Sequence, residues 1–423
     1  MYCSGIGKAF VKRNFPALTH SDFRYFWSGQ CISLIGTWMQ NVGQSWLIYT
    51  ITDSPFLTGL AGAVQFLPVM MFSLFAGIII DKYPKRKILL FTQSTSMLLA
   101  LALSALVFTG VVQYWHILIL GFLLGCNNTI DMPTRQSFTI EIAGKEDLMN
   151  AVALNSTVFN LARILGPGIG GLILGSIGAG WCFLLNGLSF IAVLYGLTKI
   201  KAAPFIREKK TDSNVLHEIM EGLSYISKEA KLIRTLSMVA VIGIFIFNFN
   251  VIIPVFTKEV LDLDGKTYGF LMSSLGAGSL IGALSVSLRS KRGPQMRTML
   301  ISSVLLSLFL AVVGFTRTYY MAGLFLAITG IFNLNFTTTA NSTLQLNSKD
   351  EFRSRVMSVY ALVFAGATPL GNLFAGFISD RFGAAAAFTL SGVIALVLLA
   401  IINIVVIPGK AKAAAAEKSQ AQA

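Results

Sequence analysis

Residues 88–130 read ILLFTQSTSMLLALALSALVFTGVVQYWHILILGFLLGCNNTI, and this stretch carries no Asp, Glu, Lys or Arg. It is long enough for two helices that each cross a bilayer, because one crossing takes roughly 20 apolar residues, and a turn is expected near Gly110. Similar stretches recur along the chain, so we predict twelve membrane-spanning helices. Their expected ranges are 25–51, 55–80, 88–109, 115–141, 148–176, 181–199, 233–257, 268–289, 297–316, 319–346, 354–379 and 384–407.

The composition places the chain in the membrane class. Of the 423 residues, 54% are hydrophobic and only 12% are charged, whereas soluble proteins carry about 25% charged residues. The apolar runs are continuous rather than alternating, which argues against a transmembrane β-barrel. The expected fold is therefore an all-α membrane protein.

Lys and Arg are distributed unevenly between alternate loops. Of the 33 Lys and Arg residues, Arg135 and Arg163 fall well within predicted spans, and nearly all the others fall in loops or at span ends on one side of the membrane. Positively charged loops stay in the cytoplasm, so both chain ends are predicted to lie there, with the protein in the cell (inner) membrane. The net charge of +14 is then a sign of topology, and nucleic-acid binding is not expected.

One long polar loop divides the twelve spans into two sets of six. We predict an N-terminal six-helix bundle over 1–200, a cytoplasmic linker over 201–231, a C-terminal six-helix bundle over 232–408 and a cytoplasmic tail over 409–423. Apolar residues at helical spacing predict an amphipathic surface helix near 217–227. The halves also echo each other, since Ser156 and Pro167 recur at the same spacing as Ser358 and Pro369.

Amide side chains concentrate in the first, fourth, seventh and tenth predicted helices. Polar groups in lipid are costly unless they are paired or hydrated, so these helices are expected to line a cavity, and the third, sixth, ninth and twelfth to face lipid. Amides and nearby aromatic rings suit an amphipathic cargo, although packing is an alternative role for each. The candidate cavity residues are Trp38, Gln40, Gln44, Asn127, Asn128, Asn248, Asn250, Asn333 and Asn335.

The second predicted helix ends in Gly77-Ile-Ile-Ile-Asp81-Lys82-Tyr83-Pro84-Lys85-Arg86-Lys87. This segment resembles motif A of the major facilitator superfamily, although Pro84 replaces the usual glycine. The resemblance implies two six-helix bundles that work by alternating access, and a cluster that latches the two halves in the outward-facing state. The implied latch residues are Gly77, Asp81, Lys82, Lys85, Arg86 and Arg135.

The fifth predicted helix contains Gly166-Pro167-Gly168-Ile169-Gly170-Gly171. It is similar to the core of motif C of antiporters in the same superfamily, with the implied motif residues Gly166, Pro167, Gly170 and Gly171. The resemblance implies export, whereas a glycine-rich packing helix would carry no direction. Three further segments, 26–30, 34–40 and 127–136, look like the drug/proton antiporter subgroup that contains macrolide efflux pumps and the enterobactin (siderophore) exporter.

Ionisable residues inside spans are candidates for function. Asp131 and Arg163 have similar predicted depths, so they are expected to be close enough to pair. We take Asp131 as the candidate proton carrier and Arg163 as the cation that neutralises it or an anionic group on the cargo. Burial favours the neutral carboxyl and a nearby cation favours the ionised one. The alternative is a permanent pair of Asp131 with Arg163 or Arg135 that only fixes packing.

The sequence thus predicts a secondary active transporter that exports an amphipathic small molecule, such as a drug, macrolide or siderophore, in exchange for protons. An uptake or exchange carrier for a lipid or metabolite is an alternative. A non-transporting membrane scaffold or sensor is least expected, because the longest loop of this chain is too short for a soluble output domain. No nucleophile–base cluster or metal-type spacing occurs, so neither an enzyme, a cofactor nor a metal site is expected. The expected partners are the small-molecule substrate, protons and the lipid bilayer, and a monomer is expected.

Overall fold

The computed structural model describes residues 15–144, 146–200, 215–289 and 293–406, except for some side chains such as those of 73–79 and 81. In this part of the chain all regular secondary structure is helical. Among the described residues, eleven helical segments are long and apolar enough to cross a membrane, one of them being Ala230–Glu259, and α2 covers the remaining predicted span. The prediction of an all-α membrane protein is confirmed.

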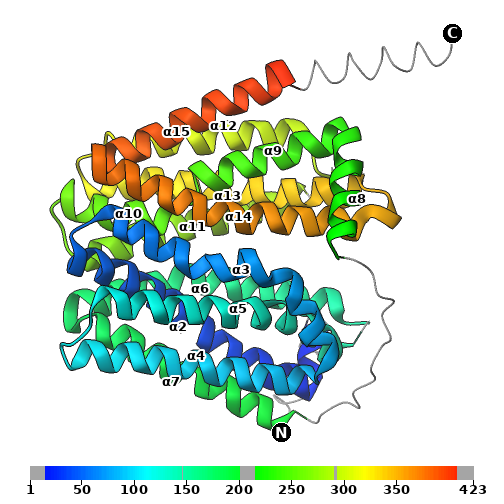
Figure 1. Cartoon of the computed structure of the whole chain (residues 1–423), viewed down its shortest axis with the longest axis horizontal. Helices are drawn as coiled ribbons and strands as arrows, with labels where there is room; N and C mark the ends of the chain where they lie inside the picture. The colour runs from blue at the N-terminus through cyan, green and yellow to red at the C-terminus, as the bar shows by residue number, and fades with distance from the viewer. Residues whose placement is uncertain (1–14, 145, 201–214, 290–292, 407–423) are drawn as a thin grey trace, which may run out of the picture. The chain divides into compact units, whose positions relative to one another are not determined.

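The helices follow the predicted spans closely (Figure 1). After a short 3₁₀ turn, η1 (Pro16–Thr19), the first half contains α2 (Ser21–Thr52), α3 (Pro55–Lys82), α4 (Lys85–Phe108), α5 (Tyr114–Ala143), α6 (Leu148–Ile177) and α7 (Ala179–Lys199). The second half contains α8 (Val215–Lys228), α9 (Ala230–Phe245), α10 (Phe249–Glu259), α11 (Gly265–Arg289), α12 (Met296–Val313), α13 (Tyr319–Asn347), α14 (Asp350–Phe382), α15 (Ala384–Ile401) and the π-helical η3 (Ile402–Val406).

The seventh predicted span differs from the expectation because it is broken into α9 and α10. Asn248 is the N-cap residue of α10, and its amide donates to the Ile244 carbonyl at 2.7 Å. This bond satisfies a carbonyl in the last turn of α9, and the Asn248 side chain makes no cap hydrogen bond to α10.

The chain forms two compact units. Unit 1 comprises Met1–Asp53, Val64–Lys209 and Asp264–Ser273, and unit 2 comprises Ser54–Ala63, Lys210–Leu263 and Ser274–Ala423. The first turns of α3 thus belong to unit 2, and the first turns of α11 to unit 1. The predicted boundaries of bundles, linker and tail stay a prediction. Residues 201–214 of the linker and the whole tail lie outside the described residues.

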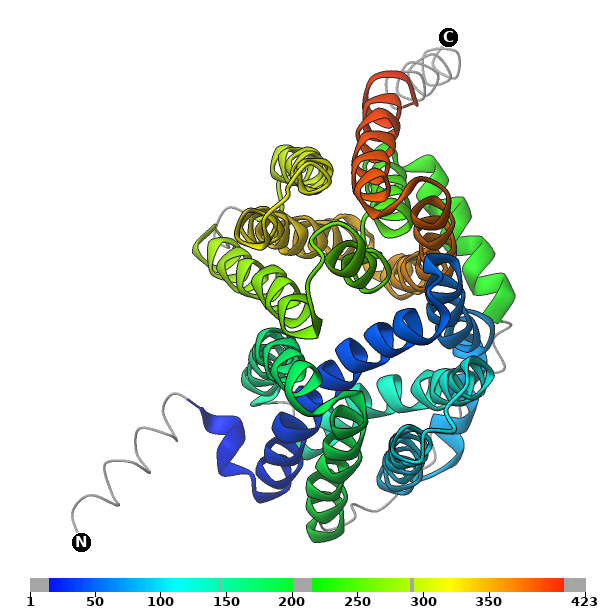
Figure 2. The same cartoon turned by 90° about the vertical axis from the view of Figure 1, so that its left-hand side faces the viewer.

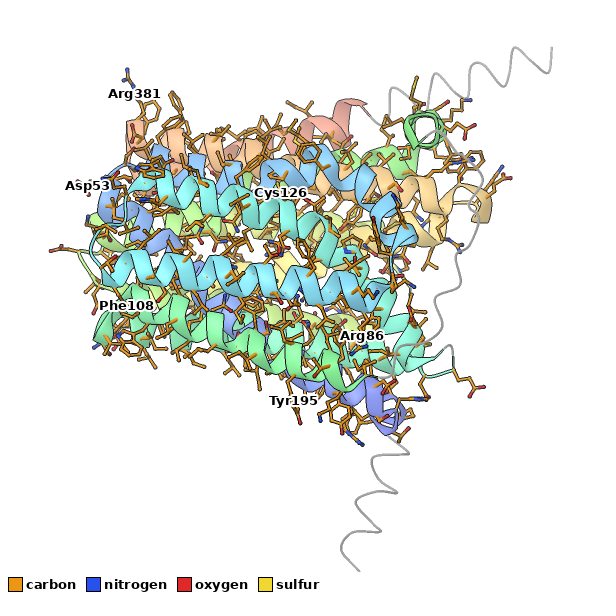
Figure 3. The ribbon with its side chains drawn as sticks, turned by 60° about the horizontal axis from the view of Figure 1, so that its bottom comes forward. Asp53, Arg86, Phe108, Cys126, Tyr195 and Arg381 are labelled. Carbon is orange, nitrogen blue, oxygen red and sulfur yellow. The ribbon has the colours of Figure 1, made fainter. Side chains whose placement is uncertain are left out.

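Unit 1 is held together by apolar packing among α2, α4, α5 and α7. One core cluster contains Phe26, Leu89, Phe138, Val193 and Leu197, and the rings of Phe26 and Phe138 meet edge to face at 5.4 Å. Figure 3 places Arg86 and Tyr195 toward one end of these helices, Asp53 and Phe108 at the other, and Cys126 in between. Cys126 directly precedes the polar segment of α5, which therefore lies between the two ends of the helices.

Unit 2 packs α12 against α13 and α15, and α14 against α9. Figure 2 shows α12 beside α13. The amphipathic helix α8 includes the whole range 217–227 that was predicted as a surface helix. It crosses one end of α14 (Figure 1). There the ring of Tyr225 stacks on Phe352 at 4.4 Å, and Arg355 pairs with Glu221 at 3.0 Å.

Candidate functional site

Asp131 lies in the middle of α5, and its side chain is held by three donors. The Thr92 hydroxyl and the Gln93 amide, both from α4, donate to Oδ1 at 2.6 and 2.8 Å. Arg135, one turn further along α5, donates to Oδ2. Asp131 is only 2% exposed. An ionised carboxylate can be kept in such an environment only when it is paired and hydrogen-bonded, as it is here.

Asn127 lies one turn before Asp131 and connects α5 to α4 by hydrogen bonds. Its amide donates to the Thr92 carbonyl at 2.9 Å and to the Ser96 hydroxyl at 2.8 Å. Because i and i+4 residues share a helix face, Asn127, Asp131 and Arg135 form one polar stripe on α5. The stripe is matched by Thr92, Gln93 and Ser96 on α4.

Arg135 links this stripe to α2, because its second terminal nitrogen donates to Gln30 Oε1 at 2.9 Å. Three buried polar atoms of the cluster have no hydrogen-bond partner among the described residues: Gln30 Nε2, Gln93 Oε1 and Arg135 Nε. Buried polar groups are usually satisfied, and ordered water often completes them. The cluster therefore has unused hydrogen-bonding capacity immediately beside Asp131.

A cavity of about 190 Å³ lies inside unit 1, between α2, α3, α4, α5 and α7. Its lining contains Gln40, Gln44, Asn128 and Arg135, while Asp131 is not among the lining residues. A liquid water molecule occupies about 30 Å³, so the cavity has room for about six waters or a small polar group. The remaining lining side chains include apolar residues of α2, α4 and α5, such as Leu34, Leu99 and Leu124.

The amides around the cavity fall into two groups. The Asn186 amide donates to Gln40 at 2.6 Å, and the Gln44 amide donates to Gln65 at 3.2 Å. Asn41 and Asn128 line the cavity without a hydrogen-bond partner among the described residues. The paired amides thus build the wall, and the two others are free to bind a ligand.

Other predicted cavity residues lie elsewhere. Trp38 packs edge to face on Phe159 at 5.8 Å and is not among the residues that line the cavity of unit 1. In unit 2, Asn248 and Asn333 are buried and Asn250 is exposed. Asn335 accepts a bond from Ser285 at 2.9 Å. The structure thus brings the unit 1 candidates Gln40, Gln44 and Asn128 together around one cavity, and the assignment of cargo contacts stays a prediction.

Arg163, the other candidate for proton coupling, does not approach Asp131 within ion-pair distance in the described part of the chain. Its guanidinium lies over the Trp38 ring, 5.9 Å from the centroid, which is a cation–π contact. Asp131 instead pairs with Arg135, the second of the two pairings expected from sequence. The expected pairing of Asp131 with Arg163 was based on their similar depth in the membrane. Depth does not determine which side of a helix a residue lies on.

The motif A cations make their contacts within unit 1. Lys85 pairs with Glu141 at 3.1 Å. Arg86 donates to the Leu197 carbonyl at 2.7 Å and the Thr198 carbonyl at 3.1 Å, so it caps the end of α7. Lys82 lies over the ring of its neighbour Tyr83. Gly77 and Asp81 belong to α3, but their side-chain surroundings lie outside the described residues, and the latch remains a prediction.

The motif C glycines lie where α6 meets other helices of unit 1. A Cβ built on Gly166 would be 2.4 Å from Trp38 Cβ, and one on Gly170 would be 3.1 Å from Met39 Cα. Gly171 faces Gly269 of α11, where an added Cβ would be 2.5 Å from that residue's Cα. A side chain would collide at Gly166 and Gly171 and would be tightly packed at Gly170, so these glycines allow α6 to approach its neighbours closely. Pro167 lies inside α6.

Several residues of the cluster were missed from sequence. Thr92, Gln93 and Asn186 belong to the third and sixth predicted helices, which were expected to face lipid. Those helices do expose large apolar side chains, such as Phe91 and Leu188, but their few polar residues point inward. A single polar residue in an otherwise apolar span is itself a signal, because it needs a partner in the bundle interior.

Comparison with known proteins now identifies the family. Residues 13–422 match the family model of transmembrane secretion effectors, a family of the major facilitator superfamily. The chain belongs to this family. It is a multi-pass membrane transporter with a small-molecule substrate, and it is not an enzyme.

Its curated relatives in this family are transporters of similar length. The staphyloferrin A transporter of Staphylococcus aureus is 27% identical over 374 residues, which cover 88% of this chain and 92% of the relative. The multidrug efflux pump Tap of Mycolicibacterium fortuitum is 26% identical and covers 81% of this chain and 85% of its own. Macrolide efflux protein A of Streptococcus pyogenes is 22% identical, with 90% and 94% covered.

Solved structures show the same fold at low sequence identity. A bacterial homologue of the human lysosomal transporter Spinster superposes with a TM-score of 0.71 at 13% identity, covering 92% of this chain and 95% of its own. The nucleoside transporter NupG gives 0.71 at 11% identity, covering 90% and 98%. These superpositions show that the chain has the fold of these transporters.

Proposed function

We propose that this protein exports an amphipathic small molecule, such as a drug, a macrolide or a siderophore, in exchange for protons. The names of its relatives support export, since they include a multidrug efflux pump, a macrolide efflux protein and a siderophore transporter. The unit 1 cavity has room for only a small group, and its mixture of amides and leucine side chains suits one polar part of such a molecule with the apolar carbons beside it.

Asp131 is the proton carrier in this proposal. The observation that supports this role is the environment of its carboxylate. Three donors stabilise the ionised form in the interior of the unit. A proton on Asp131 would cancel the charge that attracts Arg135 and weaken the bonds that the carboxylate accepts. The carboxyl thus has two states with different packing demands, as a coupling group requires.

The test is gradient-driven transport in proteoliposomes, with a labelled macrolide as the probe. We expect the unaltered protein to move it against its gradient when a pH difference is imposed, and Asp131→Asn to lose that accumulation while it still exchanges labelled for unlabelled macrolide. Glu141→Gln removes a more exposed carboxylate from the same helix and should retain accumulation. Unchanged coupling in Asp131→Asn would remove the proton role.

The direction of transport is tested with the same vesicles, on which pH gradients of either sign are imposed. An exporter accumulates the probe on the side from which protons leave. Accumulation on the side that protons enter would instead support an uptake carrier, and indifference to the pH gradient an exchange carrier.

The proposal includes a cell-membrane orientation with both chain ends in the cytoplasm and a monomeric transporter. The excess of Lys and Arg in alternate loops supports the orientation. Reporter fusions after residue 205–225 and at the C-terminus should report the same, cytoplasmic face. Opposite faces would overturn the orientation, and a mass of two chains in native mass spectrometry would overturn the monomer.

A further inference from the structure

Arg135 stands between the buried carboxylate of Asp131 and the unit 1 cavity. It lines the cavity, whereas Asp131 is not among the lining residues. Asp131 is 2% exposed and is enclosed by Thr92, Gln93 and Arg135. A cargo group in the cavity therefore meets Arg135 and not Asp131.

The protonation state of Asp131 sets the net charge behind the cavity wall. With Asp131 ionised, the Asp131–Arg135 pair is neutral. With Asp131 protonated, Arg135 stays charged, because a guanidinium does not lose its proton in proteins. The charge presented to the cavity thus changes from zero to one positive charge, although the carboxylate itself touches nothing in the cavity.

Other charged groups on the surrounding helices do not obscure this change. None of them lines the cavity among the described residues. Several make their contacts elsewhere: Asp22 with Ser21, Lys85 with Glu141, Arg86 with carbonyls of α7, Lys82 over Tyr83, Lys199 over Tyr195 and Arg163 over Trp38. Arg24 of α2 and Lys87 of α4 are exposed, and Asp81 of α3 has no described side chain.

The free amides that line the cavity together with Arg135 do not themselves select for charge. Asn41 and Asn128 each offer both donors and an acceptor, so they can hold a cationic, neutral or anionic polar group without themselves selecting for charge. Discrimination by charge then rests on the Asp131–Arg135 pair.

We infer that Arg135 is a specificity-determining residue that presents the protonation state of Asp131 to the cargo as a charge. This rests on the proposed function in taking Asp131 as the proton carrier. A cationic cargo group is repelled when Asp131 gains a proton, so cargo and proton exchange for each other. An anionic group is attracted, so it binds together with the proton. Binding of cargo and proton is reciprocal in either case.

The size of the effect follows from Coulomb's law. A unit charge at roughly 6 Å in an effective dielectric of about 20 alters binding by about a hundredfold. Hydration of the cavity reduces this, so we expect at least about a tenfold change for a singly charged group. The sign of the change depends on the sign of the charge, which no general loss of structure would reproduce.

The test uses three one-ring probes that differ in charge: benzyltrimethylammonium, benzyl alcohol and benzenesulfonate. Their dissociation constants are measured at one pH with the full chain in nanodiscs of neutral lipid, with empty nanodiscs as the blank. Asp131→Asn mimics the protonated carboxyl. It should weaken binding of the ammonium at least about tenfold, strengthen binding of the sulfonate by a similar factor, and leave the alcohol within about twofold.

The double variant Asp131→Asn/Arg135→Gln restores a neutral wall and should return all three probes to within about twofold of the unaltered protein. Glu141→Gln is the matched control and should change none of them. The inference is overturned if Asp131→Asn shifts the ammonium and the sulfonate in the same direction, if the sulfonate binds it no more tightly, or if the double variant keeps the single variant's pattern.

This binding test needs no gradient, so it separates the two proposals. Charge-dependent binding without proton-driven flux would uphold the role of Arg135 and defeat proton-coupled export. Proton-driven flux with charge-independent binding would do the reverse.

Discussion

Helix α5 of unit 1 and helix α13 of unit 2 share a packing geometry but differ in chemistry. A Cβ on Gly125 of α5 would lie 2.1 Å from the Gln65 carbonyl oxygen of α3, and one on Gly330 of α13 would lie 2.1 Å from the Leu275 carbonyl oxygen of α11. Further along, α5 carries the Asp131–Arg135 pair, whereas α13 carries Asn335, bonded to Ser285 and Ile331. A repeated scaffold thus holds a charged cluster in one half and a neutral one in the other.

The largest expected effect comes from removing one charge of the cluster. Asp131→Leu leaves the Arg135 guanidinium without its counter-ion, and we expect it to lower the free energy of unfolding by about 3–5 kcal/mol. Asn335→Leu removes only neutral hydrogen bonds and should cost about 1 kcal/mol. Reversible unfolding in mixed micelles measures both, and equal losses would contradict the distinction between the two halves.

The shared scaffold is tested by adding one methyl group to each half. Gly125→Ala and Gly330→Ala each force a Cβ onto a backbone carbonyl, so each should lower the free energy of unfolding by about 1–3 kcal/mol. Gly121→Ala is the matched control on α5, because its Cβ would lie 3.8 Å from Gln65 Cβ, an ordinary contact. Markedly unequal costs at Gly125 and Gly330 would show that the repeat is only apparent.

A smaller effect is expected at the end of α7, where Arg86 bonds two carbonyls. Arg86→Lys keeps the charge but cannot donate from a planar fork, so we expect a loss of about 1 kcal/mol in the free energy of unfolding. Lys87→Arg, at an exposed neighbouring position, is the control and should be neutral. Full stability with loss of transport would instead favour the latch role implied by motif A.

The smallest effects are expected for the two partly exposed ion pairs, Lys85–Glu141 in unit 1 and Arg355–Glu221 in unit 2. Double-mutant cycles to alanine should give coupling energies of about 0.5 kcal/mol, which salt should reduce further. A coupling above about 2 kcal/mol in only one half would show that the charge asymmetry extends to the surface.

Sequence alone specified the helices well because the bilayer imposes a strict length and polarity on each span. The break between α9 and α10 was missed, since Asn248 and Asn250 look like cavity amides, and nothing local shows that one of them would cap a new helix. Hydropathy reports where a chain crosses the membrane, and it does not report where the helix is interrupted.

The candidate site was predictable in its residues but less so in its contacts. Asp131 stands out as an acid within a span, and Gln40 and Gln44 share a face four residues apart. Their partners, Gln93 and Asn186, come from helices with a single amide each, so counting amides per helix hid them. Which cation pairs with Asp131 depended on the rotation of α6, which a depth estimate cannot provide.

Two of the helical hairpins are joined by a single glycine each. Gly178, with φ of 97°, both ends α6 and begins α7, and Gly383, with φ of 83°, does the same for α14 and α15. Because the whole connection is one residue in a conformation that side chains resist, these two hairpins have no slack for an inserted epitope or a protease cleavage site. Engineers who wish to tag this transporter should choose its longer loops, since insertion at either glycine would have to unwind a helix.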